Sequence, residues 1–296
     1  MLNDRIQPTT KRFALLGEHL GHTYSPMIHN TIFDLASADA MYLPLPFPQT
    51  ALPEAVAFLR TCFGGFNVTI PYKEKIVPYL DELHGSAAIF GAVNTVVLRD
   101  RRLLGYNTDG LGFIRALREA DIPVDRQRVL LLGGGGAARA VACEMLWRGG
   151  SVTLATRREQ SALTLREALA KHLAGAADGV GWMPFDAIRG EYDLMVNCTP
   201  LGMMPNENAC PADEKAISRC ASVFDLVYNP GETMLLQRAR AQGKKAAGGL
   251  GMLYYQALEA QKLWFGEPLL SAEQEQIVFE QFRIRIEEEN HYEHLA

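Results

Sequence analysis

Short apolar runs alternate with amphipathic segments over the first third of the chain. The apolar runs predict strands over residues 11–17, 40–45 and 66–70, and the amphipathic segments predict helices over 25–36, 53–62 and 71–80. Residues 93–107 are typical of two strands joined by a polar turn. This alternation favours an α/β sheet that contains at least some parallel strands.

The middle of the chain carries the clearest pattern. Residues 128–157 predict a buried apolar strand, a glycine turn, a helix that ends at Gly149-Gly150, and a second apolar strand. This succession is one βαβ unit of the kind that builds a doubly wound Rossmann sheet. Further strands are expected over 193–200, 222–230 and 244–249, and helices over 233–243, 250–266 and 273–290.

Length and composition limit the number of domains and the class of protein but do not indicate a function. A length of 296 residues favours two domains, and the boundary is expected near Thr108–Arg115, just before the βαβ unit. The chain is 48% hydrophobic and 21% charged with a net charge of −5, which is ordinary for a globular protein and gives no general attraction for nucleic acid. No apolar run is long enough to span a bilayer, and the first residues lack the apolar core of a secretory signal.

The five cysteines are an odd number and include no closely spaced pair. Neither a disulfide framework nor a metal site is therefore expected, and reduced thiols in a cytoplasmic protein are the interpretation.

The glycine turn is the first candidate for chemistry. Residues 133–138 match the pattern G-x-G-x-x-A, after an apolar strand and at the start of a helix. Glycine lets the backbone approach a pyrophosphate, and the start of a helix supplies N–H donors and the positive end of a dipole. The alternative is a flexible turn without a ligand.

The end of the second strand of this unit bears on the choice of cofactor. An NAD site usually places an acidic residue about 20 residues after the first glycine, to hold the ribose hydroxyls. This chain has Thr156-Arg157-Arg158 there, and its first acid is Glu159. Guanidinium groups suit a 2′-phosphate, so the charges favour NADP, unless the two arginines are merely solvated surface residues.

The N-terminal part offers a cation and a carboxylate. Lys73 follows Pro71 in the first turn of a predicted helix, where the helix dipole disfavours a positive charge, so it is a candidate for proton transfer. An ordinary surface lysine beside Glu74 and Lys75 is the alternative. Asp109 stands where the second domain is expected to begin, and it either caps the next helix or faces Lys73 across the domain cleft.

Two hydroxyls precede the first helix. Thr23 and Ser25 lie two residues apart, with Ser25 expected at the N-cap and Pro26 at the first helical position. This arrangement suits a carboxylate ligand, and its alternative is plain helix capping.

Together these segments resemble the shikimate dehydrogenase family from about Arg12 to Gly266. The resemblance rests on eight motifs in the same order, each of which is weak alone. They are HTYSP (22–26), NVTIPYK (67–73), GAVNT (91–95), GYNTDG (105–110), GGGGA (133–137), NCTPLGM (197–203), DLVYNP (225–230) and GLGMLYYQA (249–257).

The resemblance implies an NADP-dependent enzyme that reduces 3-dehydroshikimate to shikimate in the synthesis of chorismate and aromatic amino acids. Lys73 and Asp109 would be the catalytic pair and would also contact the substrate. The other residues implied for the substrate are Thr23, Ser25, Thr69, Asn94 and Gln256, with Tyr228 nearby. Those implied for NADP are Gly133, Gly134, Gly135, Gly136, Ala137, Thr156, Arg157 and Arg158, with Gly249 and Met252 beside the nicotinamide.

The resemblance also implies an architecture. It comprises an α/β substrate-binding domain over residues 1–109, a Rossmann domain over 110–249, and C-terminal helices over 250–296 that pack back on the first domain. Catalysis would take place in the cleft between the domains. The expected protein is a cytoplasmic monomer or homodimer that binds a small molecule and neither nucleic acid nor a membrane.

Two positions depart from the family pattern. Thr23 stands where the family usually has Ser, which leaves room for altered discrimination between shikimate and quinate. Ala155-Thr156-Arg157-Arg158 stands in place of T-N-R-T and retains its arginine as Arg157. A quinate/shikimate dehydrogenase that uses NAD remains an alternative, as does a non-catalytic dinucleotide sensor, although the presence of both Lys73 and Asp109 argues against a sensor.

Overall fold

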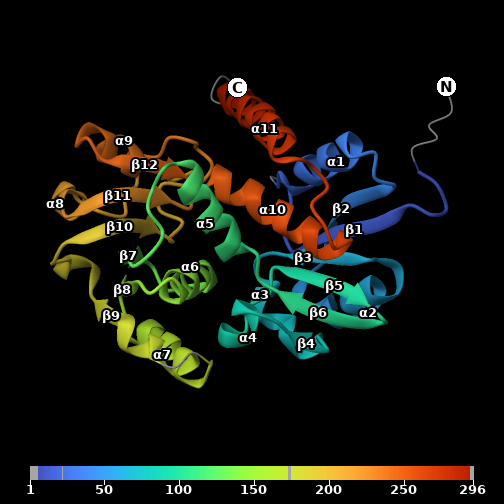
Figure 1. Ribbon diagram of the computed structural model, residues 1–296, viewed down its shortest axis with the longest axis horizontal. Helices are drawn as coiled ribbons and strands as arrows, with labels where there is room; N and C mark the ends of the chain where they lie inside the picture. Colours follow the sequence, from blue (N-terminus) through green and yellow to red (C-terminus); the bar gives the residue numbers. More distant parts are fainter. Residues whose placement is uncertain (1–5, 22, 173–174, 294–296) are drawn as a thin grey trace. The chain divides into compact units, whose positions relative to one another are not determined.

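The computed structural model describes residues 6–21, 23–172 and 175–293, so His22 of the HTYSP motif lies outside the described residues. The chain forms two compact units (Figure 1). The N-terminal unit comprises the described residues up to Thr108 together with Ala257–Phe282, and the Rossmann unit comprises Asp109–Gln256 together with the described residues from Arg283 onward. The first boundary thus falls one residue before the expected one, and the second falls inside a helix rather than at Gly249.

The N-terminal unit is built on a six-stranded mixed sheet with the order β2-β1-β3-β5-β6-β4. Its strands are β1 (Lys11–Gly17), β2 (Ala40–Pro46), β3 (Gly65–Val68), β4 (Glu82–Leu83), β5 (Thr95–Arg99) and β6 (Arg102–Tyr106). β1, β2 and β3 are parallel, whereas β5 is antiparallel to both β3 and β6. The expectation of a partly parallel sheet is therefore confirmed.

Four α-helices belong to the described residues up to Thr108. They are α1 (Ser25–Leu35), α2 (Leu52–Cys62), α3 (Tyr72–Lys75) and α4 (Ser86–Phe90). The helix expected over 71–80 is wrong in length, because α3 has a single turn and gives way to a 3₁₀ turn over Val77–Tyr79. Pro78 explains the difference, since its ring disfavours helical geometry at the preceding residue and it has no N–H to donate.

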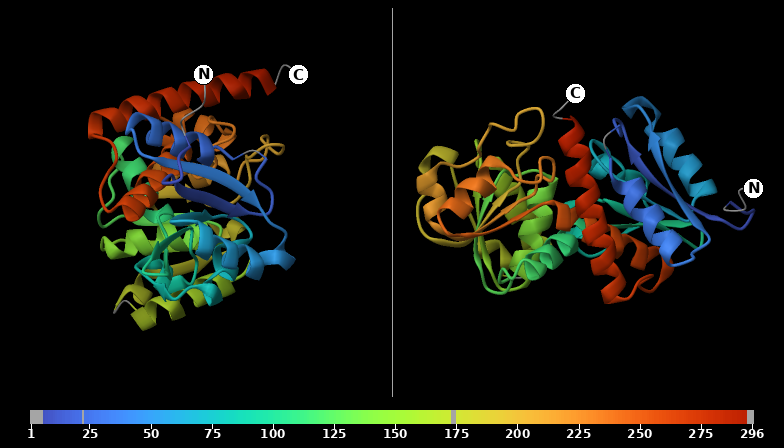
Figure 2. Two further views of the ribbon diagram at one scale, coloured as in Figure 1. Left: turned by 90° about the vertical axis from the view of Figure 1, so that its right-hand side faces the viewer. Right: turned by 90° about the horizontal axis from the view of Figure 1, so that it is seen from above.

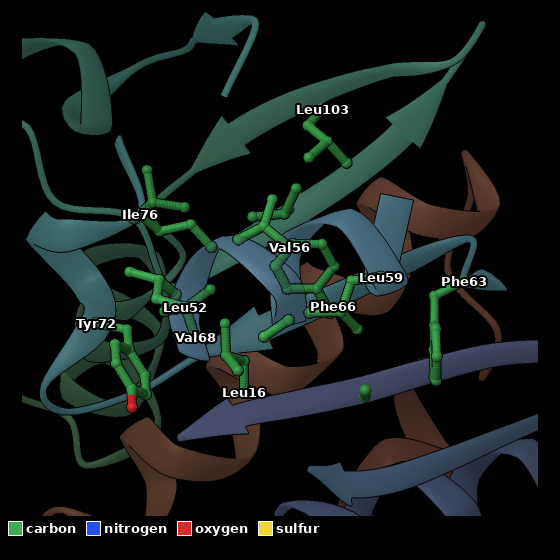
Figure 3. Packing of buried hydrophobic residues seen from close by; sticks show 14 of the residues in the cluster. Leu16, Leu52, Val56, Leu59, Phe63, Phe66, Val68, Tyr72, Ile76 and Leu103 are labelled. Carbon is green, nitrogen blue, oxygen red and sulfur yellow. The ribbon is translucent and has the colours of Figure 1, made fainter. Parts of the chain in front are cut away.

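One face of this sheet packs against α2. Leu52, Val56 and Leu59 of α2 point toward Phe66 and Val68 of β3 (Figure 3), and all five are at least 95% buried. Their spacing at i, i+4 and i+7 places them on one side of the helix, as the amphipathic pattern predicts.

The other face is covered in part by residues from near the C-terminus. Trp264 stacks on Phe13 of β1 with ring centroids 4.5 Å apart, and its indole N–H donates to the backbone oxygen of Val96 at 3.0 Å. Phe265 packs against the same cluster as Phe13 and Phe33. The N-terminal unit is therefore completed by a segment that is distant in the sequence.

The Rossmann unit has a six-stranded sheet in which all paired strands are parallel, with the order β12-β11-β10-β7-β8-β9. Its strands are β7 (Arg128–Leu132), β8 (Ser151–Ala155), β9 (Val180–Met183), β10 (Tyr192–Asn197), β11 (Cys220–Asp225) and β12 (Lys245–Gly248). The order reverses between β7 and β10, which is the switch point of a doubly wound fold. The structure confirms the βαβ unit expected over 128–157.

Helices lie on both faces of this sheet (Figure 2), as right-handed crossovers in two opposite directions require. They are α5 (Asp109–Glu119), α6 (Gly136–Trp147), α7 (Gln160–His172), α8 (Glu214–Ser218) and α9 (Met234–Ala241). Two further helices follow, α10 (Leu250–Phe265) and α11 (Ala272–Glu293), and each is divided between the two units. No helix of the described part of the chain has the length and apolar character needed to cross a membrane.

Candidate functional site

A pocket of about 1160 Å³ opens at the carboxyl ends of the Rossmann strands. Its wall consists of residues 133–135, 156–158 and 199–201, together with Ser161, Phe185 and Pro211. These segments follow β7, β8 and β10, so the pocket lies at the switch point where such folds bind nucleotides. Of the predicted cofactor residues, the glycine turn and the residues after β8 meet here.

The glycine turn shows two different reasons for glycine. Gly133 has a φ of 106°, which other residues rarely adopt, and a side chain at Gly134 would place its Cβ 2.5 Å from Cβ of Ser161. At Gly135 and Gly136, in contrast, an added Cβ would meet no described atom within 4 Å. The protein itself does not require these last two glycines, whereas a ligand that approaches the backbone there would.

The chemistry of this turn fits a dinucleotide phosphate. The 12-residue helix α6 begins at Gly136, and its N-cap residue Gly135 has no side chain that could cap the first N–H groups. The N-terminus of such a helix carries N–H donors and the positive end of the dipole. Ala137 continues the first turn with a side chain small enough to leave the backbone accessible.

The residues after β8 supply positive charge. Arg157 and Arg158 are both exposed and line the pocket, whereas Thr156 is 5% exposed. The hydroxyl of Thr156 donates to the backbone oxygen of Arg158 at 2.6 Å and accepts from the indole N–H of Trp182 at 2.9 Å. Thr156 is thus engaged with protein groups, and the two guanidinium groups are the charged groups of this wall.

A buried polar network supports the opposite wall. Asn197 at the end of β10 accepts from the backbone N–H and the hydroxyl of Thr199 at 3.0 and 2.7 Å, and donates to Asp225 at 2.8 Å. Asp225 also accepts from the hydroxyl of Thr233 and the backbone N–H of Val227. Burial raises the pKa of Asp225 above its usual value, and these three donors oppose the increase. The network holds the loop that begins at Thr199 beside Gly133.

Sequence reasoning did not single out several of these residues. Asn197 and Asp225 carry a signal, because each is a polar residue at the end of an apolar strand of a parallel sheet. Ser161 stands in the first turn of the helix after β8, which is also a recognisable position. Phe185 begins a short 3₁₀ turn over Phe185–Ala187 and Pro211 lies in a loop, and neither position has such a signal.

Of four further predicted residues of the Rossmann unit, Gly249, Met252 and Gln256 lie on or just before α10, and Tyr228 lies in the loop after β11. Gly249 is required by close packing, since an added Cβ would lie within 3.1 Å of the backbone oxygen of Val227 and closer still to that of Leu226. Met252 is 8% exposed, and Gln256 is 9% exposed and donates to the backbone oxygen of Leu253 at 3.0 Å. Tyr228 is partly buried, and burial raises the pKa of its phenol.

Three predicted substrate residues of the N-terminal unit lie near the ends of β3 and β5. Thr69 directly follows β3, Lys73 lies in α3, the helix after β3, and Asn94 directly precedes β5, which pairs with β3. Lys73 is half-buried, and its backbone oxygen accepts from the N–H of Val93 at 2.7 Å. Since α3 has one turn only, the helix-dipole argument for Lys73 no longer applies, and its case rests on the motif and its place after β3.

The predicted cap of α1 is wrong by one residue. Tyr24 is the N-cap residue and Ser25 is the first helical residue, so the Ser25 hydroxyl does not cap the helix. The hydroxyl of Thr23 accepts from the N–H of Ser25 and lies 3.3 Å from its hydroxyl oxygen, so the two side chains meet. Ser25 is 8% exposed and Thr23 is half-buried.

Asn94 holds the residue that precedes Asp109. Its side-chain oxygen accepts from the N–H of Thr108 at 2.8 Å, and its amide nitrogen donates to the hydroxyl of Thr108 at 3.0 Å. Asp109 is 8% exposed and is the first residue of α5, in the first turn of which a carboxylate is favourable. Lys73 belongs to the N-terminal unit and Asp109 begins the Rossmann unit.

Comparison with known proteins identifies the family. Residues 15–96 match the family model described as the shikimate dehydrogenase substrate binding domain. The shikimate dehydrogenase (NADP(+)) of Carboxydothermus hydrogenoformans is 41% identical over 271 residues, which cover 88% of this chain and 94% of that protein. The enzyme of the same name from Moorella thermoacetica is 42% identical over 268 residues, which cover 88% of this chain and 90% of that protein.

Solved structures agree with this result. Shikimate 5-dehydrogenase from Thermus thermophilus, in complex with NADP(H) and shikimate, matches with a TM-score of 0.81 and 34% sequence identity, over 92% of this chain and 99% of that one. An identity of about 40% over nearly the whole length, together with the same two α/β units, leads to one conclusion: the chain belongs to the shikimate dehydrogenase family.

Proposed function

We propose that this protein is an NADP-dependent shikimate dehydrogenase, which catalyses the reversible reduction of 3-dehydroshikimate to shikimate. The observation that carries the proposal is the pocket at the switch point, where a glycine turn meets Arg157 and Arg158 and none of the described residues that line the wall is acidic. The names of the two relatives and the ligands of the Thermus thermophilus structure support it. A role in aromatic amino acid synthesis and a cytoplasmic location are part of the same proposal and rest on the family resemblance.

The cofactor would be held by the residues of the pocket. Backbone groups of residues 133–135 of the pocket wall, with those of Gly136 and Ala137 at the start of α6, would hold the pyrophosphate. Arg157 and Arg158 would bind the 2′-phosphate, and Thr156 would hold the loop that carries them. Gly249 and Met252 would lie beside the nicotinamide. NADPH, when bound, supplies the hydride that reduces the carbonyl carbon of the substrate.

The two catalytic residues would handle the proton. Lys73 donates a proton to the carbonyl oxygen during reduction and takes it back in the reverse direction, and its positive charge stabilises the developing negative oxygen. Asp109 accepts a hydrogen bond from a neighbouring hydroxyl of the substrate. Thr23 and Ser25 would bind the substrate carboxylate, while Thr69, Asn94, Gln256 and Tyr228 would contact the ring and its hydroxyls.

The first experiment measures which substrate and cofactor the protein uses. We expect reduction of NADP⁺ with shikimate to be much faster than with quinate, and NADP⁺ to be preferred over NAD⁺. A preference for quinate and NAD⁺ would instead identify a quinate/shikimate dehydrogenase of catabolism. Binding of NADP⁺ without turnover of either substrate would identify a dinucleotide sensor.

The catalytic assignment is tested with a matched pair of lysines. Lys73→Ala should lower kcat by about 100-fold or more while shikimate still binds, because the loss is mainly of transition-state stabilisation. Lys75→Ala is the control, since Lys75 is exposed and bonds to Gln49 on the surface. Near-native kcat in Lys73→Ala would remove this residue from the mechanism.

The cofactor assignment is tested at Arg157. Arg157→Ala should raise KM for NADP⁺ roughly 10-fold and leave KM for NAD⁺ little changed, because only NADP carries the 2′-phosphate. Arg166→Ala on α7 is the matched control, since Arg166 is exposed and does not line the pocket. An equal rise for both cofactors would show that Arg157 supports the fold or the pyrophosphate instead.

A further inference from the structure

The segment that carries the two arginines is fixed by a side chain from the edge strand β9. Trp182 of β9 pairs with Leu154 of β8, and its indole N–H donates to the hydroxyl of Thr156 at 2.9 Å. An indole N–H can only donate, so the hydroxyl of Thr156 must direct its own proton elsewhere. That proton goes to the backbone oxygen of Arg158, with the two oxygens 2.6 Å apart.

This pair of hydrogen bonds closes a short loop around Arg157. The side chain of Thr156 spans from its own residue to the carbonyl of Arg158, two residues later, so the backbone of Arg157 is held between two fixed points. The N–H of Thr156 also donates to the backbone oxygen of Met183 at 3.2 Å, which ties the same residue to β9 a second time. The loop after β8 is therefore anchored by β9, which sequence analysis did not predict as a strand.

Thr156 also touches the glycine turn. A Cβ placed on Gly134 would lie 3.2 Å from the Cγ2 methyl of Thr156. The methyl group thus faces the glycine turn while the hydroxyl joins Trp182 to Arg158, a combination that threonine provides and valine or serine provides only in part. Thr156 and Arg158 are also two of the three positions, with Ala155, at which residues 155–158 depart from the family pattern T-N-R-T.

We propose that Trp182, acting through Thr156, is a positioning residue that presents Arg157 and Arg158 to the 2′-phosphate of NADP and so helps to set the preference for NADP over NAD. The proposal rests on the proposed function, because it assumes that the pocket binds NADP. Trp182 does not line the pocket, so its effect is expected through the shape of the loop and not through contact with the cofactor. Its removal should weaken ligands that carry the 2′-phosphate and spare those that lack it.

The test measures binding by calorimetry, without substrate or turnover, to 2′,5′-ADP and to 5′-AMP, which differ only in the 2′-phosphate. Trp182→Phe removes the N–H and keeps an aromatic ring, and Thr156→Val removes the hydroxyl at nearly constant volume. Each should weaken 2′,5′-ADP about 2- to 10-fold, the range of one hydrogen bond, and change 5′-AMP little. The double variant should be no weaker than Thr156→Val alone, since both changes break the same chain of bonds.

Two controls separate positioning from general damage. Thr156→Ser keeps the hydroxyl and should retain most of the affinity for 2′,5′-ADP, and Trp147→Phe removes an exposed indole on α6 that does not line the pocket. If Trp182→Phe and Thr156→Val weaken both ligands equally, or neither, the inference is wrong. If the unmodified protein itself shows no preference for 2′,5′-ADP over 5′-AMP, the proposed preference for NADP is wrong as well. Failure of the positioning role is thus seen in the variants, and failure of the proposed NADP preference is seen in the unmodified protein.

Discussion

Gly65 in β3 is the contact point between the first sheet and α10, and we expect alanine to be poorly tolerated there. A Cβ at this position would lie 2.5 Å from Cδ1 of Trp264, slightly closer to its indole nitrogen, and 2.8 Å from the backbone oxygen of Val96. That oxygen belongs to β5, which is paired with β3, so it cannot move away without breaking the sheet. The indole must therefore move, and its hydrogen bond to Val96 is lost.

The cost follows from two contributions. Overpacking of a closely packed site typically costs about 1–3 kcal/mol. A partly buried indole N–H left without its acceptor adds roughly 1–3 kcal/mol. We expect Gly65→Ala to lower the free energy of unfolding of the N-terminal unit by about 2–6 kcal/mol. Gly64→Ala is the control, because a Cβ there would lie 3.5 Å from the ring of Phe13, an ordinary contact, and should change stability by about 0.5 kcal/mol or less.

The assay is equilibrium unfolding in urea, followed by tryptophan fluorescence in a background in which Trp147 and Trp182 are replaced by phenylalanine. Trp264 then reports on the N-terminal unit alone, which matters because two units need not unfold in one step. Circular dichroism of the same samples follows the whole chain. A decrease below about 0.5 kcal/mol for Gly65→Ala, with an unchanged slope in urea, would refute this account of the contact.

Two further predictions concern Gly112 of α5 and His29, a fully buried residue of α1. A Cβ at Gly112 of α5 would lie 2.6 Å from the backbone N of Gln256 and 2.7 Å from the backbone O of Met252, so Gly112→Ala should displace both residues and lower kcat/KM for shikimate roughly 10- to 100-fold. Leu111→Ala, on the exposed face of α5, is the control and should leave kcat/KM unchanged. Equal kinetics of the two variants would contradict this prediction. Burial lowers the pKa of His29 to about 3, so between pH 6.5 and that value the imidazole of His29 is protonated in the unfolded chain but not in the folded protein. The free energy of unfolding should therefore decrease as the pH is lowered through this window. Urea unfolding at about pH 7.5 and about pH 5.5 should show that the stability difference between wild type and His29→Gln shrinks by about 1.4 kcal/mol at the lower pH, and a constant difference would be inconsistent with a buried neutral imidazole.

The fold was predictable where hydrophobic periodicity and glycine placement agree. Residues 128–157 show an unbroken apolar run, a glycine cluster, a helical repeat and a second apolar run, and the structure forms β7, α6 and β8 there. The four residues of β9, VGWM, were not predicted, because an edge strand of this length pairs on one side only and carries too few residues for a period to be seen. The length of α3 was wrong for a local reason, Pro78.

The site was predictable as a set of motifs but not as a set of contacts. A motif shows that Thr156 follows β8 at the ribose position, but not that its hydroxyl is engaged by Trp182 and Arg158. In the same way, GAVNT suggests Asn94 as a ligand, whereas the structure shows its side chain bonded to Thr108. Hydrogen bonds between residues far apart in the sequence depend on the packed fold and leave no local pattern.

The split composition of the N-terminal unit has a consequence for synthesis on the ribosome. β1 and β2 emerge early, but Trp264 and Phe265, which cover Phe13, follow only after the whole segment Asp109–Gln256 has been translated. At typical rates of about 5–20 residues per second, roughly 150 residues take on the order of ten to thirty seconds. Throughout that time the nascent chain exposes an apolar patch of β1 that the finished protein buries. The strands of the Rossmann sheet, in contrast, are contiguous in the chain, so this sheet has all of its strands translated before the N-terminal unit receives its last residues.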